Sequence, residues 1–337
     1  MNKLKYDGAP IKIMEVCGTH TSAIVRSGLR DLLPPRVSLV SGPGCPVCVT
    51  SAGYIDKLIE FARGGAVICS FGDMLKVPGK DASLATARAE GADIRVVYSP
   101  FDALKMAKDE RNKQFVFAAI GFETIAPVYA LLVMRAGESG IKNFKLLTAL
   151  KRITPALRFL SKNGVDGFIA PGHVAAVTGY GIFEPIAHEF LKPFCVAGFS
   201  PGNILAAIEN LIAQISRGEH TVKNLYPSVV THSGNTQAMA RISDVFEVGD
   251  AHWRGLCDIT NSGLYLKKEF ADFDAGSRDI LPSEEICSCG DVILGKLSPP
   301  QCHMYGTACT PQTPQGPCMV SSEGACGIWY KCGLGDL

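Results

Sequence analysis

The sequence predicts an α/β protein with two doubly wound parallel-sheet domains of similar topology and a small cysteine-rich domain at the C-terminal end. Two observations predict the sheets. Short apolar segments alternate with helical segments, and about eight such units are too many for one small sheet. A third observation predicts the last domain. From Cys287 onward, seven cysteines fall among frequent glycines and prolines, with little apolar sequence to build a core.

Each expected strand is a short apolar run, and each expected helix carries its apolar residues on one face. Strands are expected at residues 11–15, 37–40, 66–70, 94–98, 115–120, 145–148, 167–170 and 194–197. Helices are expected at 22–33, 51–63, 99–109, from the turn at 121–124 through Met134, before the turn at 163–164, and at 204–215. A helix at 236–245 is expected to lead into irregular strand and loop up to residue 275.

These units suggest a linear division of the chain into three domains. Residues 1–130 are expected to form the first α/β domain, 131–250 the second, and 251–337 the cysteine-rich domain. In open α/β sheets, ligands bind at the carboxyl ends of the strands. Candidate functional residues should therefore follow the expected strands directly.

Composition excludes several classes of function. The net charge is +1, and the basic residues are scattered, so a nucleic-acid partner is not expected. The longest apolar segments, such as residues 125–134, are too short to cross a membrane. The first ten residues show no signal peptide, which predicts a cytoplasmic location. In a reducing compartment, the 13 cysteines favour metal binding or redox chemistry over a disulfide scaffold.

The most distinctive segment is SGPGCPVCVT at residues 41–50, which lies between an expected strand and an expected helix. Cys45 and Cys48 would then lie where backbone N–H groups and the helix dipole favour the thiolate form. A CxxC pair is also typical of half of a zinc site, or of two buried thiols without a function. The second thiol motif upstream and the cysteine-dense segment downstream favour a redox or metal-binding role.

Further candidates follow other expected strands. Cys17 and His20 lie three residues apart at a strand-to-helix turn, and both are ligands for iron or zinc. An imidazolium at His20 would also activate the Cys17 thiolate. Glu123 and His173 are expected at carboxyl ends of strands as well. Alternatively, Glu123 interacts only with a helix dipole, and His173 is a structural histidine.

The cysteines of the last domain indicate a metal centre. One CxC pair, Cys287 and Cys289, is followed by single cysteines seven to thirteen residues apart. Zinc sites use closely spaced pairs, so this looser spacing favours a cubane iron–sulfur cluster held by loops. The metal would supply much of the folding free energy of this domain. Zinc remains the alternative.

Together these segments resemble the HypD family of [NiFe]-hydrogenase maturation proteins. The matching segments are MEVCGTHT (14–21), SGPGCPVCVT (41–50), GFET (121–124), PGHV (171–174) and the cysteine-rich segment 287–326. The resemblance covers nearly the whole chain in the same order. It implies two α/β domains plus a [4Fe–4S] domain, and a scaffold on which Fe(CN)₂CO is assembled. It also implies two partners, the small chaperone HypC and the cyanide-supplying HypE.

The resemblance implies roles for individual residues. Cys17 would hold the iron together with HypC, with His20 as its neighbour, and Cys45 and Cys48 would form a redox dithiol that could also bind the metal. Glu123 and His173 complete the expected catalytic set. The expected cluster ligands are Cys287, Cys302, Cys309 and Cys326, which leaves Cys289 and Cys318 as candidate redox thiols. Whether the protein turns over as an enzyme is left open. The alternative function is an iron–sulfur thiol–disulfide reductase of the ferredoxin:thioredoxin reductase type.

Overall fold

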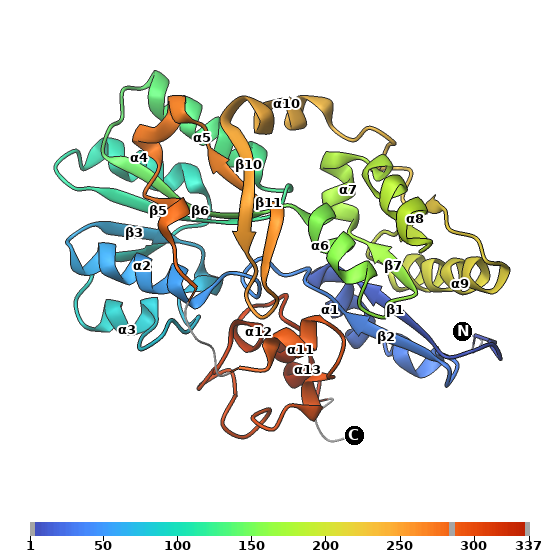
Figure 1. The fold of residues 1–337 in the computed structure, drawn as a ribbon. Helices are drawn as coiled ribbons and strands as arrows, with labels where there is room; N and C mark the ends of the chain where they lie inside the picture. Colours follow the sequence, from blue (N-terminus) through green and yellow to red (C-terminus); the bar gives the residue numbers. More distant parts are fainter. Residues whose placement is uncertain (1–3, 283–286, 334–337) are drawn as a thin grey trace.

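The computed structural model describes residues 4–282 and 287–333, and across them the strands form two sheets (Figure 1). The first sheet is entirely parallel, in the order β2-β1-β7-β8-β9. Its strands are β1 (Ile11–Glu15), β2 (Val37–Ser41), β7 (Gly167–Ala170), β8 (Phe194–Val196) and β9 (Val222–Asn224). The expected strands at 11–15, 37–40, 167–170 and 194–197 are therefore confirmed to within a residue.

Helices cover both faces of this first sheet. Apolar side chains of α1 and α9 pack on one face, and those of α6 and α8 pack on the other. The helical elements beside this sheet are α1 (Gly18–Arg26), η1 (Leu29–Leu32), α6 (Ile153–Ser161), α7 (Gly172–Thr178), η3 (Tyr180–Phe183), α8 (Glu184–Phe190) and α9 (Pro201–Arg217). The first helix begins at Gly18 instead of the expected residue 22, and this earlier start makes Cys17 its N-cap residue.

The second sheet has the order β10-β11-β6-β5-β3-β4. Its parallel strands are β3 (Val67–Ser70), β4 (Ile94–Val96), β5 (Phe115–Gly121) and β6 (Phe144–Lys151). The helical elements around it are α2 (Ala52–Arg63), η2 (Gly72–Met74), α3 (Leu84–Ala89), α4 (Pro100–Asp109), α5 (Ala126–Glu138) and α10 (Thr236–Val245). Helices α2 and α3 pack on one face and α4 and α5 on the other, so both sheets are doubly wound.

A long antiparallel hairpin extends the second sheet beyond β6. It consists of β10 (Phe246–His252) and β11 (Asp258–Leu266), and the antiparallel pairing of β11 with β6 joins it to the sheet. The expectation of irregular strand and loop here is wrong. Gly255, at φ +72°, lies in the turn of the hairpin, Gly263 lies in β11, and the register shifts after Gly249.

The sheets do not follow the expected division of the chain at residue 130, because each draws strands from both sides of it. Within the described residues the chain passes between them three times, after β2, after β6 and after β9. Strand β1 pairs with β2 and also with β7, where Ile13 lies opposite Gly167. The two sheets are therefore interleaved along the sequence.

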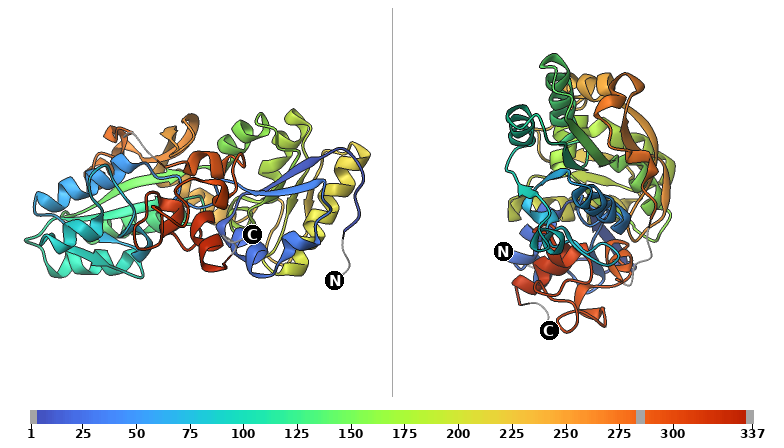
Figure 2. Two further views of the ribbon diagram at one scale, coloured as in Figure 1. Left: turned by 90° about the horizontal axis from the view of Figure 1, so that it is seen from below. Right: turned by 90° about the vertical axis from the view of Figure 1, so that its left-hand side faces the viewer.

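The C-terminal segment, residues 287–333, lies beside the junction of the two sheets (Figures 1 and 2). It contains short helical elements: α11 (Cys289–Ile293), η6 (Pro299–Gln301), α12 (Pro317–Val320) and α13 (Ala325–Lys331), and it follows η4 (Lys268–Phe273) and η5 (Ser277–Asp279). One apolar core runs continuously through both sheets and into this segment. The segment is thus packed against the rest of the chain through its apolar side chains.

Outside the main motifs, the single cysteines are mostly core residues. Cys69 and Cys195 are fully buried within strands, as expected for small apolar side chains, and Cys257 is only partly buried in the hairpin. Within residues 4–282 and 287–333, every helix is too short or too polar to span a lipid bilayer.

Two glycines fix the contact between the hairpin and α11. A Cβ atom on Gly290 would overlap the carbonyl group of Gly255, and a Cβ on Gly255 would press on the Gly290 backbone. We expect Gly290→Ala to destabilise the protein by about 1–3 kcal/mol, because neither backbone can move cheaply. Hydrogen exchange should accelerate in residues 287–333.

The matched control is Gly202→Ala in α9, where an added Cβ meets no atom of the described chain within 4 Å. This variant should be neutral or slightly stabilised, because alanine favours a helix over glycine by about 0.5–1 kcal/mol. Equal exchange rates in the two variants would contradict the proposed contact.

Candidate functional site

A cavity of about 390 Å³ lies where the two sheets and the C-terminal segment meet. Its lining combines residues from all the sequence motifs singled out above: Val16, Cys17, Gly44, Pro46, Val47, Phe122, Thr124, Pro171, His173, Ser322 and Glu323. Of the expected site residues, Cys17 and His173 line this central cavity directly. Segments as far apart in the sequence as Val16 and Glu323 therefore form one site.

Cys17 is held at the start of α1 by its own backbone. Its N–H donates to Glu15 Oε2 at 3.0 Å, and the Thr21 hydroxyl donates to the other oxygen of the same carboxylate. Burial raises the pKa of the Cys17 thiol to about 12, and the nearby Glu15 and Glu323 carboxylates add to this. The backbone N–H groups of His20 and Thr19 act in the opposite direction. The thiol is therefore neutral at pH 7 unless a cation displaces its proton.

The loop after β2 lies directly against Cys17. The Gly42 N–H donates to the Glu15 carbonyl oxygen at 2.7 Å, and a Cβ on Gly44 would overlap the backbone of Cys17. A glycine at 44 is therefore required for this close approach. The same loop continues into the CxxC motif, so the glycines place that motif beside the cavity.

Cys45 and Cys48 form a disulfide in this structure, with their Cα atoms 5.3 Å apart. Both are buried in the turn that leads to α2, at the carboxyl end of β2 as expected, and the Cys48 N–H donates to Cys45 Sγ at 3.2 Å. Pro46 and Val47 between them line the central cavity. As a disulfide the pair offers no thiolate to a metal, so any binding by these sulfurs requires reduction first.

His20 and His173 both pack against the ring of Phe199, at centroid distances of 4.8 and 4.1 Å. His20 Nε2 lies 3.2 Å from the Gly198 carbonyl oxygen, and Nδ1 is buried without a partner among the described residues. Burial lowers the pKa of His20 to about 4 and lowers that of His173 as well. His20 is therefore neutral, and the expectation that an imidazolium activates Cys17 is wrong. The sequence motifs did not indicate Phe199, whose ring packs against both histidines.

Glu123 does not face the cavity that contains Cys17. Its neighbours Phe122 and Thr124 line the central cavity, whereas Glu123 lines a second cavity of about 300 Å³ with Arg152 and Arg158. Glu123 Oε1 accepts the Ile153 N–H at 3.0 Å, and Oε2 is buried without a partner in the described part of the chain. Burial raises the pKa of Glu123 to about 7. The strand-to-helix turn thus forms a wall between two cavities.

Two carboxylates close to Cys17 were not among the expected site residues. Burial raises the pKa of Glu15 to about 7, against the effect of its hydrogen bonds with Thr21, Cys17 and Ser41. Glu323 reaches the cavity from the C-terminal segment, and a Cβ on Gly18 would overlap its side chain and backbone. Both acidic residues lie within the matching segments 14–21 and 287–326, but only the fold shows that both lie close to Cys17.

Six cysteines of the C-terminal segment gather in one place. Burial and the nearness of four other thiols raise the pKa of Cys326 well above its ordinary value. The four thiols belong to Cys289, Cys287, Cys309 and Cys302. Cys289 Sγ lies 2.6 Å from Cys318 Sγ, so these two sulfurs form a close pair within the same group of thiols. Cys332 is exposed. Across residues 4–282 and 287–333, no group of three or more His, Cys, Asp or Glu could hold a metal ion as the side chains stand.

Comparison with known proteins gives a consistent picture. Residues 1–333 match the family described as "HypD: Hydrogenase formation hypA family". The chain is 44% identical over 332 residues to "Hydrogenase maturation factor HypD" of Escherichia coli, an alignment that covers 96% of this chain and 89% of that protein. It is 42% identical over 341 residues to "Hydrogenase maturation factor HypD2" of Bradyrhizobium diazoefficiens, covering 96% and 90%. The HypD of Cupriavidus necator is 40% identical over 343 residues, covering 97% and 90%.

The buried Glu123 carboxyl predicts a pH dependence of stability. Its pKa is about 7 in the folded protein, against an ordinary value of 4.5, so its protonated form is favoured by folding. Its contribution is fully present below pH 4.5 and is lost as the pH rises to about 7. In Glu123→Gln this loss should disappear, which changes the pH dependence of the unfolding free energy by about 3 kcal/mol.

Denaturant unfolding at several pH values measures this difference. The matched control is Glu138→Gln, which replaces an exposed glutamate at the end of α5 and should leave the wild-type profile unchanged. A Glu123→Gln profile parallel to the wild-type profile would mean that the Glu123 carboxyl is ionised in the folded protein.

Proposed function

Because the chain belongs to the HypD family and therefore acts in hydrogenase maturation, we propose that it is the scaffold on which iron receives its cyanide and carbon monoxide ligands for [NiFe]-hydrogenase. The observation that carries this proposal is the convergence on one cavity of Cys17, the loop with the Cys45–Cys48 pair, and the C-terminal segment. The iron with its ligands is the cargo, and the cavity of about 390 Å³ is its proposed site.

In this proposal Cys17 is the iron ligand supplied by the chain. Thiolate is a suitable donor for low-spin iron, and iron binding would displace the proton that burial otherwise keeps on the Cys17 sulfur. The backbone N–H groups at the start of α1 would help to stabilise the resulting negative charge. His173 lines the same cavity, and we propose that it contacts the ligands of the iron.

A HypC-type chaperone would supply a further ligand to the iron, and a HypE-type protein would donate the cyanide. These partners are proposed from family membership. The lining of the central cavity supports the need for a further ligand, since Cys17 is the cysteine among its lining residues. A partner residue would have to enter the cavity to complete the coordination of the iron.

The resident cofactor proposed for the C-terminal segment is a [4Fe–4S] cluster, which would supply electrons when bound. Its proposed ligands are Cys287, Cys302, Cys309 and Cys326. The donor chemistry fits such a group, because Cys326 lies near the thiols of Cys287, Cys302 and Cys309, and of Cys289 as well, in a segment that has few apolar residues of its own. Cys289 and Cys318 are proposed as redox thiols, and the distance of 2.6 Å between their sulfurs supports a dithiol–disulfide pair beside the proposed ligands.

The Cys45–Cys48 pair is proposed as the redox dithiol of the central cavity. Reduction of this disulfide consumes two electrons and two protons and yields two thiols. Pro46 and Val47 line the same cavity as Cys17, so the reduced pair would be close to the bound iron. The electrons would come from the proposed cluster.

Cys17→Ser tests the iron site. This variant should lose the infrared bands of iron-bound cyanide and carbon monoxide when it is purified anaerobically with its HypC-type partner, because the soft thiolate ligand is gone. The broad visible absorption of the C-terminal segment should persist. His20→Gln serves as the comparison, since its ring packs behind the cavity, and it should retain the bands at least in part. Wild-type bands in Cys17→Ser would overturn the proposed site.

A second pair of variants tests the assignment of the C-terminal cysteines. Cys302→Ala should abolish the broad visible absorption and destabilise residues 287–333, because the cluster would lose a ligand. Cys289→Ser should keep most of the absorption, since Cys289 is assigned to the close pair with Cys318. Absorption that survives in Cys302→Ala and disappears in Cys289→Ser would exchange the two roles.

A further inference from the structure

A separate cavity of about 450 Å³ lies between the edge strand β2 and the C-terminal segment, away from the residues of the central site. Lys12 and Ser38 line it from the first sheet, Arg30 lines it from η1, and Lys296 and Trp329 line it from the C-terminal segment. The proposed function assigns no role to these residues. The cavity differs from the central one in its charge.

Three cations line this cavity, and none of its lining residues is an aspartate or glutamate among the residues the structure describes. The Lys12 ammonium donates to the Gly295 carbonyl oxygen at 3.2 Å, so it spans from the sheet to the C-terminal segment. The Lys296 ammonium lies 3.8 Å from Asp291, a loose pair on an exposed side chain. The lining therefore has a net positive charge that a small anion would neutralise.

Arg30 is the most strongly constrained of the three cations. Its guanidinium stacks on the Trp329 ring at 4.9 Å, and Nη1 donates to the Leu39 carbonyl oxygen at 2.6 Å. Arg30 Nε and Trp329 Nε1 are both buried without a hydrogen-bond partner within residues 4–282 and 287–333. The carboxylate that acts on Arg30 electrostatically is Glu15, which already accepts hydrogen bonds from Thr21 and Cys17. A planar guanidinium whose Nε–H has no hydrogen-bond partner in the described part of the chain is suited to bidentate binding of an oxyanion.

We propose that the cavity between β2 and the C-terminal segment binds a small organic molecule with more than one anionic group, in which Arg30 pairs with one carboxylate or phosphate. The cavity is large enough for such a molecule, since small-molecule sites typically measure about 300–1,000 Å³. Lys12 and Lys296 on opposite walls would pair with the second anionic group. Because both walls contribute, the ligand would hold α13 against the first sheet.

The experiment titrates the anaerobically purified full chain with succinate and with glycerol 2-phosphate by isothermal titration calorimetry. The first ligand represents dicarboxylates and the second represents phosphate esters, so their relative affinities identify the anionic group. Succinamide, the neutral counterpart of succinate, is the control ligand and should not bind. Saturable binding of at least one anion is expected, together with slower hydrogen exchange in α13.

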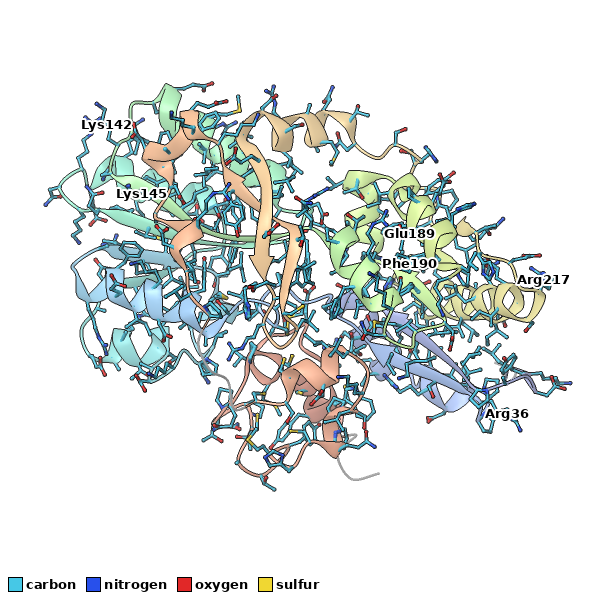
Figure 3. All side chains as sticks on the ribbon, viewed as in Figure 1. Arg36, Lys142, Lys145, Glu189, Phe190 and Arg217 are labelled. Atoms are coloured by element: carbon cyan, nitrogen blue, oxygen red, sulfur yellow. A yellow bond between two sulfur atoms is a disulfide. The ribbon has the colours of Figure 1, made fainter. Side chains whose placement is uncertain are left out.

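Arg30→Gln should weaken the binding by about tenfold or more, because the charge-assisted hydrogen bonds of the guanidinium are lost. The matched control is Arg36→Gln, which removes the same charge at an exposed arginine outside the cavity. Figure 3 shows Arg36 at the outer end of the N-terminal strands, away from the C-terminal segment. Wild-type affinity is expected in this control.

Two milder variants keep the test decisive if Arg30→Gln fails to fold. Arg30→Lys retains the charge but loses the planar fork, and Trp329→Phe retains a ring without the indole N–H. Each should bind more weakly than the wild type. If neither anion binds saturably at millimolar concentration, the proposal is overturned. Wild-type affinity in both milder variants would overturn it equally.

Discussion

The close backbone contact between Gly44 and Cys17 is the constraint on which the central site depends. An added Cβ at position 44 would overlap the Cys17 backbone. An added Cβ on Gly18, the residue after Cys17, would overlap Glu323. The dithiol loop and the C-terminal segment therefore approach Cys17 from two directions with no side chain between. The cavity exists because these backbones meet while the side chains around them leave space.

Burial decides the protonation of the groups around this cavity. It raises the pKa values of Cys17 and Glu15 and lowers those of His20 and His173, so the neutral forms of these four groups are favoured. A cation that enters such a site gains a thiolate ligand by displacing a proton, and it meets no competing positive charge from the histidines. Sequence spacing alone suggested a charged His20, because the spacing of Cys17 and His20 does not show that the His20 ring is buried.

The local sequence predicted most strands and the position of the CxxC turn, because apolar runs and glycine turns are set by neighbouring residues. It could not predict which strands pair. The Ile13–Gly167 register depends on a chain path that returns to the first sheet, and no local pattern encodes that return. Glu123 shows the same limit at the site: its position at a strand end was predicted, but alternate residues of the turn face opposite cavities. Glu15 and Glu323 were also missed, because the local sequence does not show which side chains the fold brings close to Cys17.

The interleaved path of the chain has a consequence for its synthesis on the ribosome. Strands β1 and β2 emerge early, but β7, which pairs with β1, begins only at Gly167, after most of the second sheet has been made. The N-terminal pair therefore waits with an unpaired edge while the parallel strands of the second sheet assemble. Pairing of widely separated strands is slow, and exposed edges aggregate during such delays. A nascent chain of this topology would benefit from a general chaperone until the first sheet closes.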